Sequence, residues 1–129
     1  MIDALIALQA SVTKTATFNG AALTLPGGTP RRGLNARVIY SAATNASGSN
    51  SVVFQIDVSY DAGSTWNGDF LAPAIALSTT TQTGEIHIPF SVSPTSVANG
   101  IQVRLTATFS GAGSTPTITF QGDIEAARP

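Results

Sequence analysis

The sequence contains no cysteine, which excludes a disulfide framework, a thiolate nucleophile and a cysteine-based zinc site. Charge is also scarce, because charged residues make up 10% of the 129 residues, against about a quarter in an average soluble protein. Serine and threonine fill much of that difference, with about a quarter of the chain between them. We therefore expect a surface that forms many hydrogen bonds but carries few charges.

Basic residues are few and scattered. Six basic and seven acidic residues give a net charge of -1, Lys14 is the only lysine, and Arg31 and Arg32 are the only adjacent pair. Nucleic-acid binding needs several cations concentrated on one face, so we expect no nucleic-acid partner. The apolar segment 2–8 is too short to cross a bilayer, contains Asp3 and follows no Lys or Arg. We therefore expect neither a signal peptide nor a membrane partner, and synthesis in the cytosol.

Alternation of apolar and polar residues dominates the middle and the end of the chain. Segment 52–60 reads VVFQIDVSY, and segment 101–109 reads IQVRLTATF. This period of two predicts strands that turn one face to the core and the other to water. The pattern places Asp57 and Arg104 on wet faces.

Weaker alternation extends over much of the remaining chain, in segments 10–18, 34–44, 85–90 and 117–124. Segment 85–90, EIHIPF, points Ile86, Ile88 and Phe90 inward and His87 outward. Pro89 cannot donate to a β-ladder, so this strand is expected at a sheet edge or at a bulge. Residues 2–9 are compatible with a helical turn, a strand or a loose arm.

Turn-forming residues separate the alternating segments at intervals of about ten residues. They occur in NASGSN at 45–50, DAGST at 61–65, the pair Asn99-Gly100 and SGAGS at 110–114. The chain is therefore predicted to be all-β, a single-domain antiparallel β-sandwich of about seven or eight strands, jelly-roll or immunoglobulin-like. The domain would cover 1–129, with an N-terminal arm (1–10) and a short C-terminal tail (126–129).

The segment SYDAGSTW at 59–66 resembles the Asp-box of sialidases and other β-propeller proteins, which reads Ser-x-Asp-x-Gly-x-Thr-Trp. The resemblance covers eight residues and implies a closed β-hairpin. Its members here are Ser59, Asp61, Gly63, Thr65 and Trp66. By resemblance, the Asp61 carboxylate accepts turn N–H groups, Gly63 adopts a positive φ, Thr65 bonds across the turn and Trp66 folds back onto the hairpin.

A sialidase is excluded, because a propeller needs several blades of about forty residues or more. We interpret the motif as a structural turn, with an exposed Trp66 stacking on a sugar as the alternative.

Candidate catalytic and metal-binding groups do not form a recognisable set. His87 is the only histidine, and no strand-to-helix turn carries a serine nucleophile. Asp57, Asp61 and Asp69 cluster along the sequence, but without EF-hand spacing. We predict no enzyme activity, no catalytic residues, no cofactor and no metal.

The chain as a whole is similar to the small head decoration (cement) proteins of tailed bacteriophages. The features that carry this likeness are a compact β-domain without cysteine, export signal or helices, a hydroxyl-rich surface of low charge, and apolar or basic ends. The resemblance implies a virion protein that self-associates as a dimer or trimer and binds the major capsid protein. The implied partner contacts are Met1, Ile2, Leu5, Ile6, Arg31, Arg32 and Arg128.

Two other roles stay open at this point. One is a minor tail or fibre subunit. The other is a carbohydrate-binding sandwich module, which would need exposed aromatic residues. The aromatic residues without an expected inward position are Trp66, Phe70, Tyr40 and Phe18.

Overall fold

The computed structural model describes residues 2–25, 32–92 and 100–127, and their regular secondary structure consists of β-strands. The strands are β1 (Ile2–Lys14), β2 (Phe18–Asn19), β3 (Leu23–Thr24), β4 (Leu34–Thr44), β5 (Asn50–Ser59), β6 (Asn67–Leu71), β7 (Ile75–Leu77), β8 (Gln82–Phe90), β9 (Gln102–Gly111) and β10 (Thr117–Ala127). Within these ranges, no helix has the length and apolar character needed to cross a membrane.

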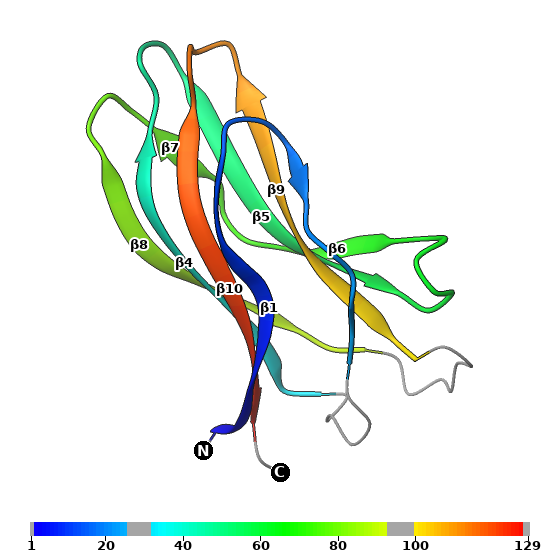
Figure 1. Ribbon diagram of the computed structural model, residues 1–129. Helices are drawn as coiled ribbons and strands as arrows, with labels where there is room; N and C mark the ends of the chain where they lie inside the picture. The colour runs from blue at the N-terminus through cyan, green and yellow to red at the C-terminus, as the bar shows by residue number, and fades with distance from the viewer. Residues whose placement is uncertain (1, 26–31, 93–99, 128–129) are drawn as a thin grey trace.

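The strands form two antiparallel sheets that pack face to face (Figure 1). One sheet has the order β1-β10-β4-β8, and the other has the order β2-β9-β5-β6. In the second sheet β3 also pairs with β9, and β7 also pairs with β5. Counting β2 with β3 and β6 with β7 as interrupted strands reduces the ten strands to eight, arranged 1-8-3-6 and 2-7-4-5. This is the jelly-roll arrangement, so the predicted all-β sandwich is confirmed and the jelly-roll alternative applies.

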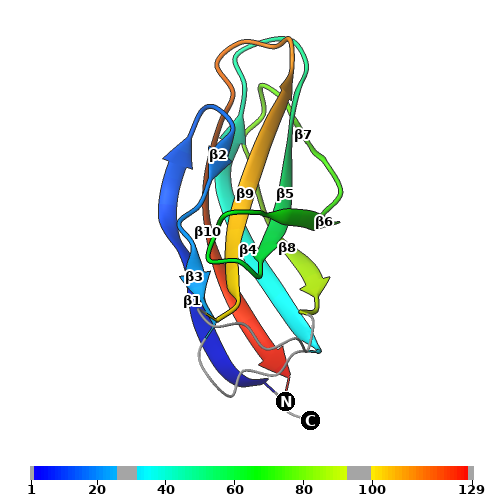
Figure 2. The same cartoon turned by 90° about the vertical axis from the view of Figure 1, so that its right-hand side faces the viewer.

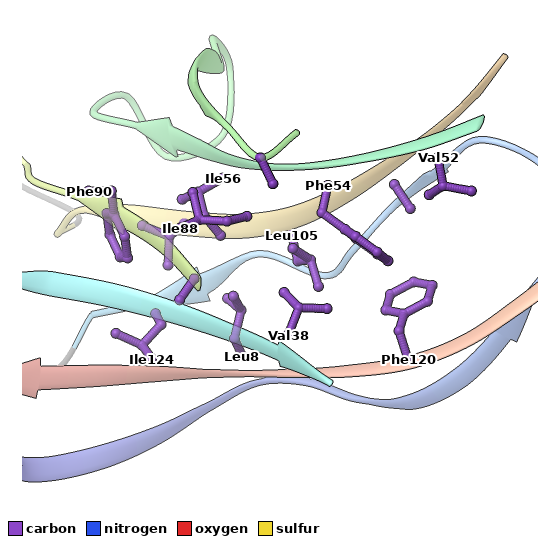
Figure 3. Packing of buried hydrophobic residues seen from close by; sticks show 14 of the residues in the cluster. Leu8, Val38, Val52, Phe54, Ile56, Ile88, Phe90, Leu105, Phe120 and Ile124 are labelled. Carbon is purple, nitrogen blue, oxygen red and sulfur yellow. The ribbon is translucent and has the colours of Figure 1, made fainter. Parts of the chain in front are cut away.

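The core lies between the sheets and is filled by the inward residues of the alternating strands (Figure 3). In β5, Val52, Phe54 and Ile56 are fully buried. The Phe54 ring meets Phe120 of β10 edge to face, with ring centroids 5.0 Å apart. Aromatic pairs in this geometry contribute beyond their buried area, so this contact helps to join the two sheets.

Residues 2–10 and 126–127 belong to strands of the sandwich, which corrects the predicted arm (1–10) and tail (126–129) over these residues. Residues 2–14 form β1, which pairs with β10 from Ile2↔Ala127 to Lys14↔Ile118. Leu8 is buried in the core, because leaving this apolar segment in water would be unfavourable. β10 continues to Ala127, so the predicted tail begins inside a strand. Met1, Arg128 and Pro129 lie outside the described residues.

Other sequence predictions have mixed outcomes. β8 is an edge strand, as Pro89 predicts. Segment 10–18 was predicted to be one strand, but β1 ends at Lys14 and Phe18 begins β2 in the other sheet. In segment 34–44, Ala42 has a positive φ of 52° beside a register shift. The shift turns Ala43 into the core in place of Ala42.

Candidate functional site

Side chains of the Asp-box segment hold the turn between β5 and β6. The Ser59 hydroxyl donates to Asp61 Oδ1 at 2.8 Å and accepts from the Gly63 N–H at 2.9 Å. Asp61 Oδ1 also accepts from the Thr65 N–H at 2.8 Å. Gly63 has a φ of 90°, a conformation that side chains with a Cβ disfavour. The turn therefore takes its hydrogen-bond partners from its own side chains.

The same contacts shift the titration of Asp61. The Thr65 N–H and then the Ser59 hydroxyl lower the pKa of Asp61 below its ordinary value, because they stabilise the carboxylate. Asp61 itself is exposed to solvent. The motif is thus a solvent-facing turn that depends on an ionised side chain.

A buried carboxylate lies in β5, four residues before Asp61, at a position where the sequence predicted a solvent-exposed face. Asp57 of β5 is only 3% exposed. Its Oδ2 accepts from Arg104 Nε and from the Thr106 hydroxyl, both at 2.9 Å. Its Oδ1 accepts from Gln55 Nε2 at 2.7 Å. Three donors therefore satisfy this carboxylate, as a buried charge requires.

The hairpin covers this carboxylate from outside. The Arg104 guanidinium carbon lies 4.3 Å from the centroid of the Trp66 ring, a cation–π contact. Figure 2 shows the loop before β6 lying across β9, the strand that carries Arg104. Gly68 leaves room for the network, since a Cβ there would lie 2.5 Å from Gln55 Nε2 and 2.9 Å from Asp57 Oδ1. Trp66 thus folds onto the neighbouring strand and fixes the arginine.

The outer face of the four-stranded sheet carries a second polar cluster. His87 Nε2 lies 2.7 Å from Glu85 Oε2, and Asn35 Nδ2 lies 2.9 Å from His87 Nδ1. Because the Asn35 nitrogen donates, His87 Nδ1 accepts and Nε2 donates to Glu85. Arg37 lies 3.5 Å from Glu85 and 3.6 Å from Glu125.

Neither polar cluster resembles a catalytic or metal centre. The ring nitrogens of His87 contact Glu85 and Asn35, so no hydroxyl is positioned as a nucleophile beside them. Within the described ranges, no group of three or more His, Cys, Asp or Glu residues is arranged to hold a metal ion. The chemistry of both clusters is that of ion pairs and hydrogen bonds.

Predicted contact elements from distant parts of the chain meet at one end of the sandwich (Figure 1). Ile2 pairs with Ala127, and Leu34 pairs with Ala126 on the neighbouring strand. Arg32 is exposed and precedes Leu34 by two residues. We call this region, comprising Ile2, Arg32 and Ala127, the terminal end.

The other predicted partner contacts are placed as follows. Leu5 pairs with Glu125 in the interior of β1. Ile6 is partly buried and packs against the core, and its role as a partner contact stays a prediction. Met1, Arg31 and Arg128 lie outside the described residues.

The four aromatic candidates for a sugar-binding platform are all partly buried. Phe18, Tyr40 and Phe70 are partly buried and pack against the core, which leaves less of their rings available to a sugar. Phe70, for example, meets Phe90 edge to face at 6.0 Å between centroids. Of the four aromatic candidates, Trp66 is the one outside the core cluster, and it is half-buried.

No protein-family model and no curated protein sequence matches this chain. Among solved structures, a CBM4 carbohydrate-binding module gives a TM-score of 0.51 at 15% identity, covering 86% of this chain and 61% of the other. This chain thus spans less than two thirds of that protein. The N-terminal cellulose-binding domain of a β-1,4-glucanase from Cellulomonas fimi gives 0.41 at 17% identity, covering 97% and 78%. A chain from infectious bursal disease virus, Gx strain, gives 0.38 at 12% identity, covering 96% and 32%. The CBM4 likeness shows a shared β-sandwich fold and does not extend to function.

Replacing Asp57 should destabilise the protein strongly. Asp57→Ala leaves Arg104 without its buried counter-ion. We expect the free energy of unfolding to fall by about 3 kcal/mol, near the lower limit for breaking a buried pair. We expect a value near this limit because the Arg104 side chain is 21% exposed, so water can partly solvate the unpaired charge. Urea unfolding measures the loss, and the exposed Asp69→Ala serves as the control, with a change within about 0.5 kcal/mol. Equal losses in the two variants would contradict the structural role of Asp57.

The contribution of Asp61 to stability should depend on pH. Because its pKa is lowered in the folded protein, the contribution is fully present above the unfolded value of 3.8. It disappears as the pH falls through the lower folded value. In urea titrations, the free energy of unfolding of the wild type should therefore exceed that of Asp61→Ala at pH 7. The two free energies should converge towards pH 2. A difference that stays constant over this range would show that the charge of Asp61 is unimportant.

Proposed function

We propose that this protein is a non-enzymatic structural component of a tailed-phage virion, a head decoration protein that self-associates and binds the capsid lattice. The observation that carries the proposal is the terminal end. There the N-terminal strand, the segment with Arg32 and the C-terminal strand lie side by side, although they are far apart in the sequence. In this proposal the terminal end faces the capsid.

The rest of the surface suits close packing of identical copies. Exposed hydroxyl groups pair across neighbouring strands, as in Ser51–Ser110 at 2.8 Å and Thr13–Thr119 at 2.7 Å. A net charge of -1 produces little repulsion between copies. A surface with paired hydroxyls and few charges tolerates neighbours on several sides.

Arg32 gives the terminal end a group that can recognise a protein partner. Guanidinium groups bind carboxylates through paired, charge-assisted hydrogen bonds. The corresponding partner group is a carboxylate on the surface of the major capsid protein. Removing residues 1–8 would also remove Ile6 and Leu8 from the sandwich, so a point substitution at Arg32 separates binding from folding.

Arg32→Ala should weaken binding to capsids by about tenfold or more, because charge-assisted hydrogen bonds contribute about 1.5–3 kcal/mol and 1.4 kcal/mol corresponds to tenfold. Co-sedimentation with capsids assembled from the major capsid protein of the same genome measures the effect. Ala46→Asp is the matched control, since it lowers the net charge equally at an exposed position on the β4–β5 turn. The proposal fails if wild-type protein stays in the supernatant, or if both variants lose binding equally. Binding to isolated tails instead of heads would indicate a tail or fibre subunit.

A carbohydrate-binding role is the second candidate, and Trp66 is the observation that favours it. The ring lies half-buried on the outer face beside Arg104, and the CBM4 module shares the fold. Trp66 is the only tryptophan, so intrinsic fluorescence reports on this position alone.

We expect no saturable fluorescence change when oligosaccharides from a glycan array are titrated into the protein, because the other aromatic candidates are partly buried against the core and leave Trp66 without a matching ring. A saturable change that persists in Arg32→Ala would favour the carbohydrate role and overturn the virion role.

A further inference from the structure

An anchored arginine and an exposed leucine both lie on the outer face of the six-stranded sheet. Arg104 is held through Nε by Asp57 and stacks on Trp66. Within the described ranges, its two terminal nitrogens make no hydrogen bond. Leu71 is 57% exposed, the only large hydrophobic side chain with such exposure among the described residues. We call Trp66, Leu71 and Arg104 the Arg104 patch.

Leu71 and Arg104 lie on the same outer face, on the two strands that flank β5. Leu71 pairs with Gln55, and the Gln55 side chain donates to the carboxylate that holds Arg104. Directly opposite residues in an antiparallel pair share a face, so Leu71 and Gln55 lie on the same side of the sheet. Tryptophan and arginine are the residue types most enriched at the energetic centres of protein interfaces. Here both are fixed before any partner arrives.

The outer face of the opposite sheet presents the complementary groups. Glu85 is exposed and lies directly opposite Ile39 in the β4–β8 register. Ile39 is half-buried and lies outside the core cluster. A carboxylate beside an apolar side chain therefore faces outward there, matching an arginine beside an apolar side chain on the other face. Glu85 already contacts His87 at 2.7 Å and Arg37 at 3.5 Å, and it keeps acceptor capacity beyond these contacts, because a carboxylate has about four acceptor sites.

We propose that neighbouring copies associate face to face, with Glu85 and Ile39 of one copy docked on the Arg104 patch of the next. This inference rests on the proposed function, since it specifies the self-association of a decoration protein. The two surfaces lie on opposite outer faces, so one copy contacts a different neighbour through each, which is a heterologous contact. With the terminal end towards the capsid, both faces point sideways to adjacent copies (Figure 1). The contact forms rows, and the capsid lattice limits their length.

The absence of native cysteine allows a disulfide test of this contact. The double variant Leu71→Cys/Ile39→Cys, oxidised at high protein concentration, should give a ladder of covalent oligomers on a non-reducing gel. Neither single variant should give the ladder. The control Ala76→Cys/Ile39→Cys places the first cysteine at another exposed position of the same sheet and should stay monomeric.

Two results of the disulfide test would overturn the inference. Disulfide dimers of Leu71→Cys alone would show an isologous contact, and no ladder from the double variant would show that the faces do not meet.

Light scattering gives an independent measurement, because wild-type mass should rise with concentration in multiples of 13.1 kDa, whereas Leu71→Asp should remain monomeric. Capsid co-sedimentation of Leu71→Asp distinguishes the two proposals. If Leu71→Asp still binds capsids and the mass of the wild type does not change with concentration, this inference is removed and the virion role remains.

Discussion

The packing of the two sheets against each other determines where every outer-face group lies. Phe54 and Phe120 meet across the core, and Ile56 and Leu105 fill the space beside them on paired strands. A strand cannot slip by one residue without moving these side chains into water. The same register places Asp57 directly opposite Arg104 on the outside. The interior packing thus positions the ion pair whose carboxylate is the most deeply buried among the described residues, and that pair positions the arginine of the proposed interface.

Much of the fold can be read from the sequence because the strands alternate so regularly. Segments 52–60 and 101–109 became the paired strands β5 and β9, and Pro89 marked an edge. The first strand was harder to predict. Residues 2–8 are apolar almost throughout, so they carry no period that separates helix, strand and arm. Only the partner strand β10, more than a hundred residues later, shows that they extend the sheet.

The candidate site was less accessible to sequence reasoning. Asp57 and Arg104 each occupy a position that alternation assigns to water, and their hydrogen bond joins residues 47 positions apart. The pairing becomes visible only once the register between β5 and β9 is known. The covering hairpin was foreseeable from SYDAGSTW, but its direction across β9 was not, because local turn chemistry does not determine which neighbouring strand the turn packs against.

The adjacency of Ile2 and Ala127 has a practical consequence for engineering the protein. A peptide or purification tag attached to either terminus emerges at the same pole, the one that is proposed to lie on the shell. Cargo for outward presentation belongs at the far pole instead, in the exposed residues 46–49 between β4 and β5. Chain ends that lie this close also permit circular permutation, so a short linker across the termini and a cut in that far turn would reverse which pole carries the free ends.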